Sequence, residues 1–238
     1  MFEETAARCR DYRTDGEGEI QIAVTRRDLE HEREKAFRGS AVRGDKTAAV
    51  SDPELEALAL YRKIAERMPA FDTWLMHGSA VSTEGEAVIF AAASGVGKST
   101  HTALWLEQIP GVFVVNGDKP LLNIRNGTCY VCGTPWAGKE GWNRNLLVPL
   151  KAICLLSRGK ENHIREISFE EAFPLLLRQT YRPQEAEALE KTLGLLQRLD
   201  GMVRFYDLVC RPDPEAAQTA YKALFRREGN DGEQNDIL

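Results

Sequence analysis

The sequence predicts an α/β protein with a mixed β-sheet, helices packed on that sheet, and a phosphate-binding loop at its centre. The apolar run Val88–Ala93 indicates a buried strand, and it leads directly into the glycine-containing turn and helix start Ser94-Gly-Val-Gly-Lys-Ser-Thr100. The strand-like run Trp74–Val81 comes before it, and Thr83–Glu86 between the two indicates a hairpin turn. We therefore expect the strand that feeds the loop to pair antiparallel with its predecessor, unlike the parallel crossovers of common nucleotide-binding sheets.

Length and composition limit the classes of protein to which the chain can belong. Its 238 residues, 43% hydrophobic and 28% charged, are typical of a globular domain with an appendage. We place the appendage at 1–50, the main domain with the phosphate loop at 51–227, and a disordered polar tail at 228–238. The formal net charge of -5 argues against broad binding to nucleic acid or acidic membranes.

Targeting signals and metal motifs are not evident in the sequence. Met1–Thr5 lacks the basic and apolar regions of a signal peptide, and no apolar run approaches the ~18 residues of a membrane span. The five cysteines form an odd, scattered set that suits reduced thiols, so we expect a cytoplasmic protein. Cys129-Tyr-Val-Cys132 is an isolated pair in a strand-like run, which favours neither a zinc site nor a redox motif.

The first 50 residues indicate a strand and a helix that cover one edge of the main sheet. Apolar and polar residues alternate over 20–24, which predicts a half-buried strand. Thr25 is expected to cap a short charged helix, because Asp28 follows at a capping-box spacing. A mobile loop is expected over 39–50.

The main domain should open with a helix. Ser51 or Asp52 is expected to cap it, and Pro53 suits its first turn. The apolar stripe within 55–64 is expected to pack on the sheet, and Pro69 ends the helix.

Each residue type of the phosphate loop has a physical reason. Gly95 and Gly97 allow a sharp turn and a close approach to an anion. The backbone amides after Ser94 can surround phosphate oxygens, helped by the positive end of the following helix. Lys98 is placed to reach the β- and γ-phosphates, and the Ser99 hydroxyl to bind Mg²⁺. The expected phosphate-binding residues are Ser94, Gly95, Val96, Gly97, Lys98, Ser99 and Thr100.

The match to the pattern G-x-x-x-x-G-K-[ST] is incomplete, because Ala92 occupies the first glycine position. The alternative is a chance Gly-Lys-Ser at a helix start. Chance would not also supply the preceding strand and Gly95, so we favour the phosphate loop.

A metal-binding carboxylate is expected at the end of the next strand. Val112–Asn116 is a continuous apolar run that predicts a central strand, and it ends at Asn116-Gly-Asp-Lys-Pro120. A carboxylate at a strand end after the phosphate loop is where a Mg²⁺ ligand is needed, so we select Asp118. The alternative is a turn aspartate, since Asn-Gly-Asp is also turn chemistry.

Three further polar residues are candidates for the site. His77 lies at a kink next to Gly78, where the alternative is a strand histidine bound to a backbone carbonyl. Lys139 and Arg144 lie in a glycine-rich loop, 133–145, which also carries two tryptophans. Either cation would neutralise charge on a transferring phosphoryl group, and the alternative is solvated surface charge.

The remaining elements complete an alternating α/β pattern. Turn chemistry at Arg125-Asn-Gly127 predicts a hairpin between two short strands. The expected hairpin strands are 121–124 and 128–132, the later strands 147–157 and 202–209, and the later helices 168–178, 184–199 and 213–227.

Several of these segments together resemble the catalytic domain of HPr kinase/phosphorylase and its small stand-alone relatives. The resemblance covers roughly residues 70 to 225 and rests on His77-Gly78, Ser94–Thr100, Asn116–Pro120, Gly133–Lys139 and Tyr181-Arg-Pro183. That family shares its fold with ATP-dependent phosphoenolpyruvate carboxykinase, in which the strand before the phosphate loop is likewise not a simple parallel neighbour. The resemblance thus implies a mixed-sheet phosphate-loop fold of this type, with a kinase-like domain at 51–227.

The resemblance also implies an activity, namely ATP-dependent transfer of the γ-phosphoryl group to a serine-like hydroxyl of a peptide or small molecule. By position, Ser94–Thr100 would hold the phosphates, Ser99 with Asp118 would hold Mg²⁺, and His77 would lie beside the acceptor. The long amino-terminal domain and the phosphorylase signature of the HPr enzymes are not recognised, so HPr itself is not the expected acceptor.

One departure from the family keeps other functions open. The family usually has two adjacent acids at this strand end, whereas this chain has Gly117 at the first position. A general base typically contributes ~10²–10⁴-fold in rate. The alternative is therefore a nucleotide-binding regulatory protein with little or no catalysis, and a third is a carboxykinase-like or plain NTPase reaction.

Overall fold

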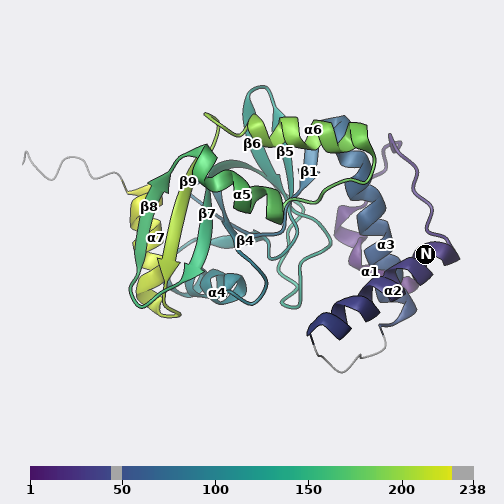
Figure 1. Ribbon diagram of the computed structural model, residues 1–238, viewed down its shortest axis with the longest axis horizontal. Coiled ribbons are helices and arrows are strands. Elements are labelled where there is room, and N and C mark those ends of the chain that lie inside the picture. The colour runs from purple at the N-terminus through teal and green to yellow at the C-terminus, as the bar shows by residue number, and fades with distance from the viewer. Residues whose placement is uncertain (44–49, 227–238) are drawn as a thin grey trace, which may run out of the picture.

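The structure is a computed structural model that describes residues 1–43 and 50–226 (Figure 1). The expected tail at 228–238 and half of the loop expected over 39–50, residues 44–49, lie outside these residues. The helices are α1 (Glu3–Arg8), α2 (Arg26–Arg43), α3 (Asp52–Arg67), α4 (Lys98–Gln108), α5 (Phe169–Gln179), α6 (Ala186–Gln197) and α7 (Pro214–Phe225), with 3₁₀ turns η1 (Arg10–Tyr12) and η2 (Met68–Phe71). The strands are β1 (Thr73–Leu75), β2 (Ser79–Thr83), β3 (Glu86–Ala91), β4 (Phe113–Asn116), β5 (Leu121–Arg125), β6 (Thr128–Cys132), β7 (Leu147–Arg158), β8 (His163–Ile167) and β9 (Arg204–Cys210).

The sheet is mixed, as the sequence predicts. Its main path runs β1-β5-β6-β7-β3-β2-β4, and β9 pairs with β7 and β8. β3 is antiparallel to β2, which confirms the predicted hairpin, and parallel to β7, which is itself parallel to β9. The phosphate-loop strand therefore lies between an antiparallel and a parallel neighbour.

The single strand expected over Trp74–Val81 is two strands in different parts of the sheet. β1 pairs with β5, whereas β2 pairs with β3 and β4. Between them, the backbone amide of His77 donates to the Gln179 carbonyl, and that of Gly78 donates to the Asp118 carbonyl. A Cβ atom at Gly78 would lie 2.7 Å from Ile89 Cγ2, so only glycine fits at this crossing.

β4 is not the central strand that its apolar sequence predicts. It is the last strand of the path, antiparallel to β2. Its other edge is covered by the loop before β7, because Gly117 N–H donates to the Trp142 carbonyl and Arg144 N–H to the Val115 carbonyl. That cover explains why an edge strand is buried and apolar.

Helices cover both faces of the sheet. The side chains of β3 alternate, so that Ile89 joins the core beneath α5 and α6 while Phe90 joins the core beneath α4 and α7. Leu176 and Leu196 fill the first core, and Trp105 fills the second. Burial of β3 on both faces fixes the position of the loop that follows it.

The N-terminal helices pack on α3, not on an edge of the sheet. No strand forms over 20–24, and α2 extends through residues that the sequence assigned to a loop. Arg62 of α3 contacts Glu32 and lies 3.3 Å from an Asp28 oxygen, which joins α2 to α3. Figure 1 shows α1, α2 and α3 grouped at one end of the molecule.

Two other expectations differ from the structure. α3 contributes to neither core beneath the sheet faces, and it contacts α1, α2, η2 and the loop after β6 through Trp136. β8, which the sequence left unassigned, pairs antiparallel with β9. Among the described residues, no helix combines the length and apolar character needed to cross a bilayer.

Candidate functional site

The predicted phosphate loop connects β3 to α4. Gly95 and Gly97 have φ angles of 80° and 123°, which side chains rarely tolerate, and Gly97 is the N-cap of α4. Ala92 is not among the residues with positive φ, so this position does not require the glycine of the full pattern. The first amides of α4 have no partner within the helix, which leaves them for an anion.

Arg158, at the end of β7, holds the loop from outside. Its Nε donates to the Val96 carbonyl at 2.8 Å, and one terminal nitrogen donates to the Gly95 carbonyl at 2.6 Å. A trans peptide is planar, so the N–H group that follows each carbonyl points the opposite way. The amide of Gly97 is thereby directed away from Arg158.

Lys98 is partly buried. Its ammonium donates to the Ala92 carbonyl at 3.0 Å. Burial lowers the pKa of this lysine, while the negative charge of Asp118 acts in the opposite direction. The strand-end carboxylate is therefore close enough to influence the loop lysine electrostatically, although the two come from separate segments.

Asp118 lies in a turn that several groups hold in place. The Asn116 side-chain oxygen accepts hydrogen bonds from the backbone amides of Asp118 and Lys119. The carboxylate lies 3.2 Å from His77 Nε2 and accepts a hydrogen bond from Lys119 Nζ at 2.8 Å. Burial alone would raise the pKa of Asp118, but the His77 hydrogen bond and the Lys119 charge outweigh it and lower that pKa well below its usual range.

His77 links Asp118 to the end of α5. Its Nδ1 lies 2.9 Å from the Gln179 side-chain oxygen, and its Nε2 faces Asp118. The structure thus brings together His77 and Asp118, which the sequence singled out in separate segments.

Lys139 and Arg144 are both exposed. Arg144 lies over the Phe113 ring, 4.6 Å from its centroid. The loop itself passes the strand end, because a Cβ atom at Gly138 would lie 3.1 Å from that of Asp118. The loop backbone is near the carboxylate, and the contribution of either cation to the site stays a prediction.

The donor groups fit a metal ion that enters with a nucleotide. In the described part of the chain, no group of three or more His, Cys, Asp or Glu side chains could hold a metal by itself. Mg²⁺ bound with nucleotide phosphates needs only one or two carboxylates from the protein. Asp118 and the Ser99 hydroxyl would meet that need.

Three residues near the site were not predicted from the sequence, namely Lys119, Gln179 and Arg158. Lys119 donates to Asp118, and its ammonium lies 5.3 Å from the Tyr61 ring centroid. Its position directly after the predicted carboxylate was an available signal. Gln179 and Arg158 end a helix and a strand, and their approach to the site depends on how those elements pack.

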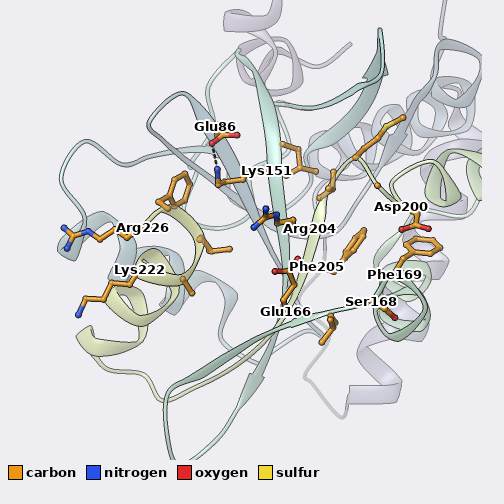
Figure 2. Close-up of a pocket in the computed structure, with 18 of the residues that line it drawn as sticks. Glu86, Lys151, Glu166, Ser168, Phe169, Asp200, Arg204, Phe205, Lys222 and Arg226 are labelled. Atoms are coloured by element: carbon orange, nitrogen blue, oxygen red, sulfur yellow. Dashed lines mark hydrogen bonds and ion pairs between the residues drawn. The ribbon is translucent and has the colours of Figure 1, made fainter. Parts of the chain in front are cut away.

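Two cavities border the sheet at opposite ends of its parallel strands. The larger, about 1340 Å³, is lined by residues at the start of β3 and β9, including Glu86 and Arg204, and by none of the predicted site residues (Figure 2). The smaller, about 370 Å³, borders the phosphate loop at Gly97 and Thr100. The large cavity is therefore separate from the candidate site.

Comparisons with known proteins find similarities among solved structures. The chain matches no family model and none of the curated proteins. Among solved structures, the HPr(Ser) kinase/phosphatase from Coxiella burnetii is similar at 11% identity and a TM-score of 0.36, over 66% of this chain and 99% of that one. A similarity this low carries no argument about function, which must come from the residues of this chain.

Proposed function

We propose that this protein is an ATP-dependent phosphotransferase that moves the γ-phosphoryl group to a hydroxyl of a peptide or small molecule. The observation that carries the proposal is the pairing of Asp118 with His77 at 3.2 Å after β4, where the Asp118 charge acts on Lys98 of the phosphate loop. Phosphoryl transfer needs mainly positioning and charge neutralisation. A loop cation beside a strand-end carboxylate supplies both.

Different residues would bind the phosphates and the metal ion. The loop amides and the start of α4 would hold the phosphates, and Lys98 would leave the Ala92 carbonyl to meet the β- and γ-phosphate oxygens. Ser99 and Asp118 would hold Mg²⁺. When bound, this ion neutralises charge on the phosphates.

The proton of the acceptor needs a base. As the acceptor oxygen bonds to phosphorus, its proton must move to a nearby group, and the bond from the γ-phosphorus to the bridging oxygen of ADP breaks. Asp118 and His77, paired at 3.2 Å, are the bases at this end of β4. The resemblance to the HPr kinase family implies the same reaction class, in which His77 would lie beside the acceptor.

A second candidate function is nucleotide binding with little turnover. The position before Asp118 is Gly117, and the space that a side chain would occupy there is narrow. A Cβ atom at 117 would lie 3.0 Å from the Ala137 carbonyl oxygen and 3.4 Å from Trp142 Cβ. The loop thus packs closely where the family usually places its first acid.

The two functions are separated by incubating the protein with γ-labelled ATP, Mg²⁺ and a cell extract, and then resolving peptides from small molecules. A kinase transfers label to one of these fractions, and Lys98→Ala should abolish that transfer. Full transfer by Lys98→Ala would refute the proposal. Clear binding of Mg-ATP without label would establish the binding protein, and release of free phosphate alone would indicate an NTPase.

A further inference from the structure

We propose that the small cavity beside Thr100 receives the base and ribose of an adenine nucleotide, so that the nucleotide lies across the sheet with its γ-phosphate toward Asp118. The inference rests on the proposed function and deepens it. It assigns a direction to the nucleotide, a place for the nucleoside, and a preference for one base.

The cavity adjoins the loop on the side away from Asp118. Thr100 and Leu104 line it from α4, Arg158 from the end of β7, and Arg211 and Pro212 from the segment after β9. Its volume of about 370 Å³ lies within the about 300–1,000 Å³ typical of small-molecule sites. No predicted phosphate or metal ligand other than the loop residues Val96, Gly97 and Thr100 lines it.

The order of the strands gives the direction. β3, which carries the loop, has β2 and then β4 on one side, and β7 and then β9 on the other. Asp118 follows β4, whereas Arg158 ends β7 and Arg211 follows β9. The carboxylate and the cavity therefore lie on opposite sides of the loop. Because Asp118 follows β4 and would hold the Mg²⁺ that accompanies the phosphates, the γ-phosphate points toward β4 and the nucleoside toward the cavity beside β9.

The side chains that line the cavity suit a flat base that needs few hydrogen-bond acceptors from the protein. Leu104, Leu156 and Pro212 form apolar walls, and no carboxylate or carboxamide side chain lines the cavity within the described residues. Guanine has a ring N–H donor in addition to an exocyclic amino group, whereas adenine has the exocyclic amino group alone as a donor. A guanine in this cavity would therefore leave more donors unpaired than an adenine, which costs binding free energy.

Two arginines are held so that a base can stack on them. Arg158 is fixed by the Gly95 and Val96 carbonyls, and Arg211 lies 2.7 Å from an Asp213 oxygen. Guanidinium groups stack on aromatic rings, and a side chain that is already held loses less conformational freedom on binding. Arg158 would thereby join the phosphate loop to the nucleoside cavity.

The test separates the contribution of the nucleoside to binding from that of the phosphates. Leu104→Trp places a large ring in the cavity, and Leu106→Trp makes the same change on α4 at a position that is 38% exposed and does not line the cavity. Pro212→Trp fills the cavity from its opposite wall and sits at an exposed position. Binding of ATP, GTP and inorganic tripolyphosphate, each with Mg²⁺, is measured by calorimetry on all four proteins.

We expect the unmodified protein to bind ATP at least about tenfold more tightly than GTP or tripolyphosphate. Leu104→Trp and Pro212→Trp should each weaken ATP binding about tenfold and leave tripolyphosphate binding unchanged, which also shows that these variants are folded. Leu106→Trp should change neither.

Three results would overturn the inference. ATP binding that survives both cavity variants would leave the proposed kinase standing but place the nucleoside elsewhere. Equal affinities for ATP and GTP would refute the base preference. If neither ATP nor tripolyphosphate binds the unmodified protein, the proposed function fails, and the inference fails with it.

Discussion

The phosphate loop and the turn at Asn116–Lys119 both carry charged residues of the candidate site, but the chain holds them in different ways. The loop is one continuous segment, shaped by its own glycines and held from outside by Arg158. The carboxylate of the turn contacts His77 from the β1–β2 connection, and that histidine is in turn held by Gln179 of α5. Local sequence therefore specifies the part that would bind phosphate, whereas tertiary packing assembles the part that would act on the acceptor.

The largest expected effect comes from removing the charge of the turn. Asp118→Asn should lower phosphoryl transfer by at least about 10²-fold, because under the proposed function the carboxylate would serve both as metal ligand and as base. Asp118→Asn should still bind nucleotide without Mg²⁺, whereas Lys98→Ala should lose this binding. The measurements are the transfer rates and nucleotide affinities of the two variants. An equal loss of Mg-free nucleotide binding in both variants would contradict the separation of the phosphate loop from the turn.

Gly117→Asp adds the acid that the turn lacks. We expect transfer to rise by about 10²-fold if a base limits the rate. The Ala137 carbonyl and Trp142 must shift by a few tenths of an ångström, so the free energy of unfolding should fall by about 1 kcal/mol. Gly117→Ala adds the same Cβ without the carboxylate, and it should lose stability but gain no activity. A gain in the alanine variant would contradict the explanation.

Arg158→Leu tests the outside support of the phosphate loop. Two carbonyls lose a charged donor, so the affinity for Mg-ATP and for tripolyphosphate should fall about tenfold, with turnover at saturation little changed. Arg165→Leu removes another arginine, which is about half exposed on β8 and pairs with Glu171, and it is the matched control. A loss of turnover without a loss of affinity would assign Arg158 a different role.

The smallest effect concerns stability in acid. The pKa of Asp118 is lowered in the folded protein, so its contribution to stability is present above the ordinary aspartate pKa of about 3.9 and is lost as the pH falls toward the lower folded value. The free energy of unfolding of the unmodified protein should exceed that of Asp118→Asn by about 1.5 kcal/mol at pH 7. The difference should vanish in strong acid, whereas the exposed Asp200→Asn should show none at either pH.

Patterns that depend on a few neighbouring residues could be predicted from the sequence. The hairpin before the phosphate loop formed as expected. The Asn126-Gly127 turn between β5 and β6 has φ angles of 49° and 76°, which fit the two-residue turn that this pair favours. In both cases the turn residues and the flanking strands are adjacent in the chain.

Features that depend on distant partners could not be predicted in the same way. The run Trp74–Val81 has the composition of one strand, but its start pairs with β5 and its end pairs with β3. β4 is apolar like a central strand because a loop, not another strand, covers its edge. The partnership of His77 with Gln179 depends on where α5 ends relative to the sheet, which no local pattern encodes.

The length of β7 has a consequence for how the protein unfolds. The residues 152–155 pair with β3 on one edge and with β9 on the other, so their amide hydrogens should exchange only when the whole domain unfolds. The phosphate loop begins at the end of β3 and is held by Arg158 at the end of β7. A nucleotide bound there would be attached to the part of the molecule that opens last, and its binding should slow hydrogen exchange throughout the sheet rather than in the loop alone.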